Sequence, residues 1–285
     1  MGQVPRQAFE LAGLPIVQEV FSRVKIVVSV KLVPDPNAEK RIDPATKRLV
    51  RTGVDTVINP YDEYAIEAAL QLKEKLGGDT TVTVFSMVPE TGKETVRKAL
   101  AMGADDAVML SDPGLEGTDV WGTAYVMAQG LKKVGFDLVI CGGLSDDGSS
   151  GGVPGALAEY LGVPGLTNAR HVEVADGKLK CQRETDNGYQ VVTGPLPAVV
   201  SVTMAVGEPR YPSLKGIMGA KKKTIAVIPI AELGLERAAG TDGAKTELLQ
   251  FAPPAARAKA HVVNAEDGAS GAKAIFDFLK ERKLI

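Results

Sequence analysis

Short β-branched runs alternate with amphipathic stretches through the first half of the chain, and this alternation limits the fold more than any other feature. The run IVVSV, which follows Lys25, is typical of a parallel strand buried on both faces. Further strands are predicted over residues 80–85, 107–110 and 137–141, and helices over residues 60–76, 94–102 and 119–133. This order predicts an α/β protein with a doubly wound, mostly parallel sheet.

The first predicted helix carries clear end signals. Asn59 is a favourable N-cap residue, and Pro60 fits the first helical position. Apolar residues then recur at spacings of four, three and four, which places them on one helical face: Ala65, Ala69, Leu72 and Leu76. Gly77-Gly78 ends the helix.

The pattern changes after Leu161. Two extended runs flank the hairpin dipeptide Asp176-Gly177, and the runs YQVVTG and PAVVSVTM follow, so we expect an antiparallel extension of the same domain. Past Ile230 the chain is rich in Ala, Gly and Pro, and it closes with an amphipathic helix. We predict an N-terminal appendage over residues 1–23, an α/β domain over residues 24–230, and a C-terminal linker and arm over residues 231–285.

Composition excludes several classes of protein. The chain of 285 residues has 33 basic and 35 acidic side chains, a balance that does not suit a general nucleic-acid binder. No apolar stretch approaches the ~18 residues that an integral membrane segment needs. Two cysteines and two histidines are too few for a disulfide framework, and they form no metal-binding motif. We expect a cytoplasmic protein without a metal site.

The loop after the strand over residues 137–141 is the main candidate for a binding site. It reads GGLSDDGSSGGVPGALAEYLG and runs directly into a predicted helix. Ligands of open parallel sheets bind at the carboxyl ends of strands, and such a turn can direct several backbone N–H groups at a phosphate. It has neither a Walker A lysine nor a GxGxxG motif, so it predicts phosphate binding without phosphoryl transfer. A plain strand-to-helix connection is the alternative.

Polar residues near this loop also have two interpretations. Asp146 and Asp147 could bind Mg²⁺ or a ribose hydroxyl, although adjacent aspartates in a polar loop are most often solvated. The segment from Asn59 to Asp62 could contact an adenine edge or a ribose while also capping its helix.

A later segment, PRYPSLKGIMGA, places apolar side chains among prolines and glycines. Because we expect an irregular loop there, its apolar residues have no periodic face to bury. They either plug the core or dock on a partner, and the residues alone favour the plug slightly.

Taken in order, these segments resemble the β subunit of electron transfer flavoproteins over about residues 24–228. The resemblance is strongest in RETDNGYQVVTGPLPAVVSVTMAVGEPRYPSLKGIMGAKKKTI. It implies a fold like that of the adenine-nucleotide hydrolases and a heterodimer with an α subunit that carries most of a redox-active FAD. It also implies a non-enzymatic electron carrier that accepts electrons from acyl-CoA or other flavin dehydrogenases.

By the same resemblance, an AMP without a redox role would bind in this chain. Its pocket would be formed by the following residues: Val30, Asn59, Asp62, Met87, Asp147, Ser150, Gly151, Gly152 and Val153. Leu214, with Ile217 and Met218, matches the segment that docks partner dehydrogenases.

The sequence departs from many relatives at the phosphate loop. Gly152 stands where a glutamine is common and Pro154 where a threonine is frequent, so backbone N–H groups would replace side-chain contacts to the phosphate. In a second branch of the family the same pocket holds the ADP part of another FAD, and those proteins bifurcate electrons. A stand-alone adenine-nucleotide sensor or hydrolase is the alternative from another class.

Overall fold

The computed structural model describes residues 23–252, 260 and 262–285. These residues divide into two compact units, and the division falls between Glu247 and Leu248. The predicted appendage lies outside the described residues except for Arg23. The predicted domain boundaries at residues 23 and 230 stay predictions.

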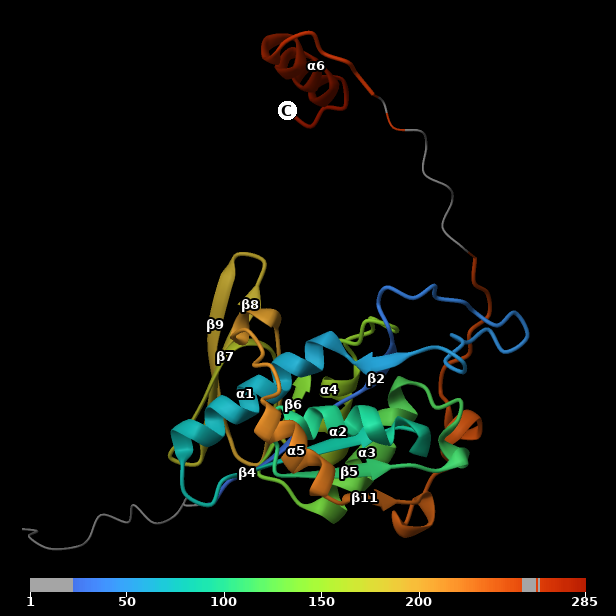
Figure 1. The fold of residues 1–285 in the computed structure, drawn as a ribbon, viewed down its shortest axis with the longest axis vertical. Coiled ribbons are helices and arrows are strands. Elements are labelled where there is room, and N and C mark those ends of the chain that lie inside the picture. The colour runs from blue at the N-terminus through green and yellow to red at the C-terminus, as the bar shows by residue number, and fades with distance from the viewer. Residues whose placement is uncertain (1–22, 253–259, 261) are drawn as a thin grey trace, which may run out of the picture. The chain divides into compact units, whose positions relative to one another are not determined.

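A nine-stranded sheet forms the centre of the first unit (Figure 1). Its strand order is β11-β5-β4-β1-β6-β10-β7-β8-β9. Its strands are β1 (Lys25–Ser29), β4 (Thr81–Met87), β5 (Asp106–Leu110), β6 (Leu138–Gly142), β7 (Gly165–Ala175), β8 (Lys178–Thr185), β9 (Gly188–Pro195), β10 (Ala198–Val202) and β11 (Ile225–Ile228). Strands β11 to β7 pair in parallel, while β8 and β9 add antiparallel pairs. The predicted fold class is confirmed.

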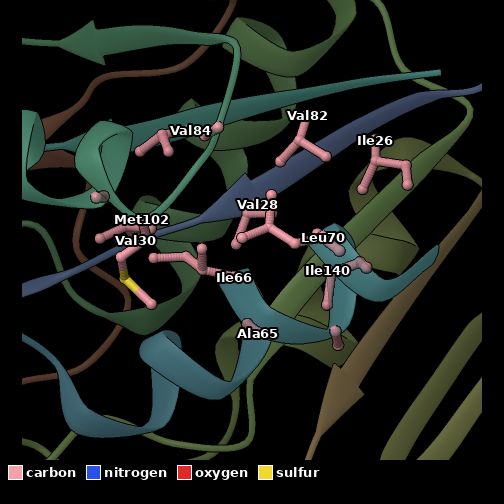
Figure 2. Close-up of a cluster of buried hydrophobic side chains, with 14 of the residues drawn as sticks. Ile26, Val28, Val30, Ala65, Ile66, Leu70, Val82, Val84, Met102 and Ile140 are labelled. Atoms are coloured by element: carbon pink, nitrogen blue, oxygen red, sulfur yellow. The ribbon is translucent and has the colours of Figure 1, made fainter. Parts of the chain in front are cut away.

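Helices cover both faces of this sheet. The helices are α1 (Pro60–Leu76), α2 (Lys93–Ala101), α3 (Val120–Val134), α4 (Val153–Leu161) and α5 (Leu214–Lys222). Residues of α1 and α2 belong to one buried cluster, and residues of α3 and α4 belong to another. Figure 2 shows the first cluster, where Ile66 and Leu70 of α1 lie among side chains of the central strands.

Shorter elements connect these layers. Strands β2 (Leu32–Pro34) and β3 (Thr56–Ile58) form a separate antiparallel pair. Single 3₁₀ turns are η1 (Glu90–Gly92), η2 (Pro113–Leu115), η3 (Met204–Val206), η4 (Ile230–Glu232) and η5 (Gly240–Gly243).

Two sequence predictions need correction. The run PAVVSVTM does not join the antiparallel extension, because β10 lies between β6 and β7 and is parallel to both. All five of its residues are buried, which is why it lacks the polar positions of a half-exposed strand. The segment around Leu214 is not an irregular loop, since α5 begins there and Ser213 Oγ accepts a hydrogen bond from Gly216 N–H at 3.0 Å.

The second unit contains α6 (Gly268–Glu281). A capping box starts this helix, because Asp267 accepts from Ser270 N–H and the Ser270 hydroxyl accepts from Asp267 N–H. Its residues Ile275 and Phe276 are exposed. The predicted C-terminal helix is present, and the predicted linker lies partly outside the described residues.

Candidate functional site

The sheet has one topological switch point, between β1 and β6. From β1 the chain continues through β4 and β5 on one side, and it then crosses to β6, which begins the other side; β11 returns to the first side, beside β5. Open α/β sheets bind ligands at the carboxyl ends of the strands that flank such a point. Val30 follows β1 there, and the Gly/Ser turn over residues 143–152 follows β6.

The Gly/Ser turn has a backbone shaped to present N–H groups. Ser149 and Gly151 take left-handed φ values of 49° and 61°, and Ser149 N–H donates to Ser145 O at 2.7 Å. The N–H groups of Ser150, Gly151 and Val153 donate to no other described residue. They lie where α4 begins, so its dipole adds a positive potential. The turn can accept a phosphate through its main chain.

Asn59 fixes the first half of this turn. Its Nδ2–H donates to Leu144 O at 2.9 Å, and its Oδ1 accepts from Asp146 N–H at 3.0 Å. Asn59 is buried, and it makes no side-chain capping bond to α1. The sequence correctly places it directly before the helix, but its amide serves the turn instead of the helix end.

Asp62 joins the ends of β1 and β6 from the first turn of α1. Its Oδ2 accepts from the main-chain N–H of Lys31 at 2.7 Å, and burial raises the pKa of its carboxyl to about 7. Gly142 packs directly against this helix turn. A Cβ at Gly142 would contact Asp62 Oδ1 and would lie 2.8 Å from the carbonyl carbon of Tyr61. Only glycine permits this approach.

Three cations that the sequence analysis missed surround the turn. Lys31 Nζ lies 2.6 Å from Asp147 Oδ1 and 3.1 Å from Ser145 Oγ, and Arg51 donates to Asp147 Oδ2. Lys40 Nζ lies 2.7 Å from Asp146 Oδ2. These pairs join residues about a hundred positions apart, so local spacing gave no signal for them. Only the position of Lys31, directly after a strand, could have suggested it.

Asp147 is the charge that organises this cluster. Its side chain is fully buried beneath Lys31 and Arg51. Burial alone would raise the pKa of Asp147, but hydrogen bonds from those two cations outweigh it and lower the pKa to about 2. A carboxylate held in this way repels a phosphate less than a free one and keeps two cations beside the turn.

The remaining predicted pocket residues lie at the same edge of the sheet but make fewer contacts with the turn. Ser29 pairs with Phe85, so Val30 and Met87 are near one another at the carboxyl ends of β1 and β4. The side chain of Val30 points into the core beside Ile66 (Figure 2), and its main-chain N–H donates to Phe85 O at 2.9 Å. Met87 is half-buried against the cluster formed by α3 and α4.

The predicted docking residues form a separate surface on α5. Leu214 is 78 % exposed, and Ile217 and Met218 are also exposed. The interpretation of these residues as a core plug is therefore wrong. Gly216 lies on the opposite side, where a Cβ would meet the main-chain carbonyl of Ala101. This close contact with the end of α2 turns the apolar residues outward.

Other kinds of site find no support in the described part of the chain. It contains no group of three His, Cys, Asp or Glu residues arranged to hold a metal ion. None of its helices combines the length and apolar character needed to cross a membrane.

Together, the doubly wound sheet and the N–H-rich turn at its switch point define an α/β protein suited to bind a phosphorylated ligand. Residues 46–233 match the family model described as electron transfer flavoprotein domain. The chain is 42 % identical over 265 residues to electron transfer flavoprotein subunit beta of Mycobacterium bovis, covering 91 % of this chain and 99 % of that protein. The corresponding subunit of Megasphaera elsdenii is 36 % identical over 267 residues, covering 91 % and 97 %.

A third relative has a different name. The Caffeyl-CoA reductase-Etf complex subunit CarD of Acetobacterium woodii is 34 % identical over 264 residues, which cover 92 % of this chain and all of that protein. The chain belongs to the electron transfer flavoprotein family, as a β subunit. Membership implies electron transfer rather than conventional enzymatic turnover, association with flavin, and an α-subunit partner.

Proposed function

We propose that this chain binds AMP at the turn after β6 and pairs with an α subunit to form a cytoplasmic electron carrier. The observation that carries the proposal is the set of main-chain N–H groups at Ser150, Gly151 and Val153, which have no acceptor among the described residues. A phosphate dianion supplies the acceptors that such groups require.

The cations beside the turn support the same ligand. Lys31, Lys40 and Arg51 bring three positive charges, and Asp146 and Asp147 bring two negative ones. The cluster keeps one net positive charge next to the helix dipole of α4, which favours a phosphate. Ser150 adds a hydroxyl at the exposed side of the turn.

We assign the rest of the AMP to residues at the end of β1 and the start of α1. Asn59 holds the turn in place, while Asp62 and the main chain of Val30 lie between the turn and the β4 edge. Met87 and Gly152 complete the apolar and glycine-lined sides of the proposed pocket. AMP would stabilise the domain and take no part in redox chemistry.

In the proposed heterodimer a FAD shared with the α subunit supplies the redox chemistry. This chain contributes burial and orientation of the cofactor, and it presents a docking surface to flavin dehydrogenases such as acyl-CoA dehydrogenase. We place that surface at Leu214, Ile217 and Met218, because exposed apolar side chains on a short anchored helix can fill a partner pocket.

Co-expression with the α subunit tests the carrier function. We expect a yellow complex whose flavin is reduced by acyl-CoA dehydrogenase and its substrate. A β chain that fails to yield any flavin complex with its α subunit would contradict the proposal. ATP turnover by this chain alone would instead favour a nucleotide hydrolase.

A second FAD in place of AMP is the alternative for this pocket. The support for this alternative is the similarity to a subunit of a caffeyl-CoA reductase-Etf complex, because the match covers that relative from end to end. Arg51 and Lys40, which reach the turn from residues 35–55, would then face a second phosphate. Two FAD molecules per heterodimer would decide for this alternative.

A further inference from the structure

The segment over residues 207–213 leads into α5, and Arg210 provides its hydrogen bonds to α1. Within the described residues, the main chain of residues 207–212 makes no hydrogen bond to another main-chain group. Arg210 lies at the centre of this segment and reaches α1. The contacts of Arg210 are therefore the hydrogen-bonded attachment of this segment to α1.

Arg210 makes a forked contact with a buried carboxylate. Its Nε–H donates to Glu67 Oε2 at 2.7 Å, and its Nη2–H donates to Glu67 Oε1 at 3.0 Å. The main-chain N–H of Arg210 also donates to Glu67 Oε2, at 3.2 Å. A planar guanidinium makes this paired contact in only one orientation, so both the side chain and the backbone of Arg210 are fixed.

The acceptor is itself held in place. Glu67 is 5 % exposed, and its Oε1 accepts a second hydrogen bond, from Gln71 Nε2–H at 3.0 Å. Glu74, further along α1, accepts from Arg210 Nη1–H. Burial would raise the pKa of Glu67, but the hydrogen bonds from Arg210 outweigh burial and lower it, so the carboxylate stays ionised at neutral pH.

The far end of α5 has its own attachment. Arg97 Nη1–H donates to Ala220 O at 2.8 Å and to Lys223 O at 3.0 Å, and Lys223 Nζ donates to Ala104 O at 2.6 Å. These contacts tie the last turn of α5 to α2 and the loop after it. The first turn, which carries Leu214, packs through Gly216 on the end of α2, and the segment directly before it is tied through Arg210 to α1.

We propose that Arg210 is a positioning residue for partner docking. Through its paired hydrogen bonds to Glu67 it fixes the start of α5 and the direction in which Leu214 projects. This inference rests on the proposed docking function of Leu214, Ile217 and Met218. A docking segment that is already ordered loses less conformational entropy when a partner binds. Loss of the Arg210–Glu67 hydrogen bonds should therefore weaken docking and leave electron transfer within the formed complex unchanged.

The test uses the αβ complex with its flavin, and acyl-CoA dehydrogenase as electron donor. Arg210→Ala should raise the KM for the carrier about tenfold while kcat changes by less than about twofold. Arg210→Lys should also raise the KM, because an ammonium keeps the charge but loses the fork. Flavin content should equal that of the unchanged protein in both variants.

Lys133→Ala is the matched control. It removes an exposed ion pair between α3 and Glu232 of η4, outside the docking surface, and should leave the KM unchanged. Leu214→Ala tests the docking function itself. A normal KM for Leu214→Ala would refute the proposed docking surface. A raised KM for Leu214→Ala together with a normal KM for Arg210→Lys would overturn only the role of Arg210, as would lost flavin in the Arg210 variants.

Discussion

Replacing Asp62 by asparagine should change how the stability of the chain depends on pH. Burial raises the pKa of Asp62 from 3.8 to about 7 in the folded protein. Between these two values the unfolded chain is ionised at this group and the folded chain is protonated. Folding stability is therefore highest below pH 3.8 with respect to this group, and it falls as pH rises toward 7.

The size of the effect follows from the same shift. About three pH units at 1.36 kcal/mol each give a loss of roughly 4 kcal/mol above pH 7. The asparagine side chain of the variant would not ionise, but it has one acceptor oxygen where Asp62 accepts from the main-chain N–H groups of Lys31 and Gly142. Loss of one such bond costs about 1 kcal/mol. Asp62→Asn should therefore stabilise the chain by about 3 kcal/mol at pH 8 and destabilise it slightly near pH 4.

Urea unfolding of the two proteins, followed by circular dichroism from pH 4.5 to pH 8, measures this difference. All other titrating groups are shared, so their contributions cancel in the comparison. The free-energy difference between variant and unchanged protein should grow in favour of the variant as pH rises. A difference that stays constant over this range would refute the assignment of a raised pKa to Asp62.

Other substitutions test the site and the docking surface. Gly142→Ala should cost about 1–3 kcal/mol in thermal unfolding, because its Cβ would press on the carbonyl of Tyr61, whereas Gly155→Ala, with open space around it, should be neutral or stabilising. Arg51→Ala should weaken AMP binding several-fold in calorimetry at low salt, with a smaller loss at high salt; equal affinity would remove Arg51 from the phosphate site. Leu214→Ala should impair reduction by acyl-CoA dehydrogenase with unchanged nucleotide content, and normal reduction would count against docking.

The central strands were predictable because buried parallel strands have a distinctive composition. The runs that form β1 and β6 are apolar and β-branched, and glycine or a capping residue marks the elements around them. The same rule explains the error at β10. Its residues are as apolar as those of β1, but the hairpin that precedes it suggested an antiparallel neighbour. Sequence separation hid its parallel pairing with β6.

The candidate site was predictable in its location but not in its charges. The Gly/Ser turn after a buried strand predicts phosphate contact from local sequence alone. The pairing of Asp147 with Lys31 and Arg51 depends on the sheet bringing β1 and β6 side by side, and it cannot be inferred from spacing. The start of α5 was missed for a different reason, because glycine and proline near Leu214 are weak helix formers. The capping hydrogen bond that Ser213 accepts from Gly216 N–H stabilises the helix start despite these residues.

Small molecules released on denaturing the co-purified αβ complex give the most direct test of the central claim, that the turn after β6 holds AMP. Quantitative mass spectrometry should find one FAD and one AMP per heterodimer. The α subunit separated from this chain should contain no AMP. Two FAD molecules without AMP, or FAD with no other adenine nucleotide, would contradict the assignment.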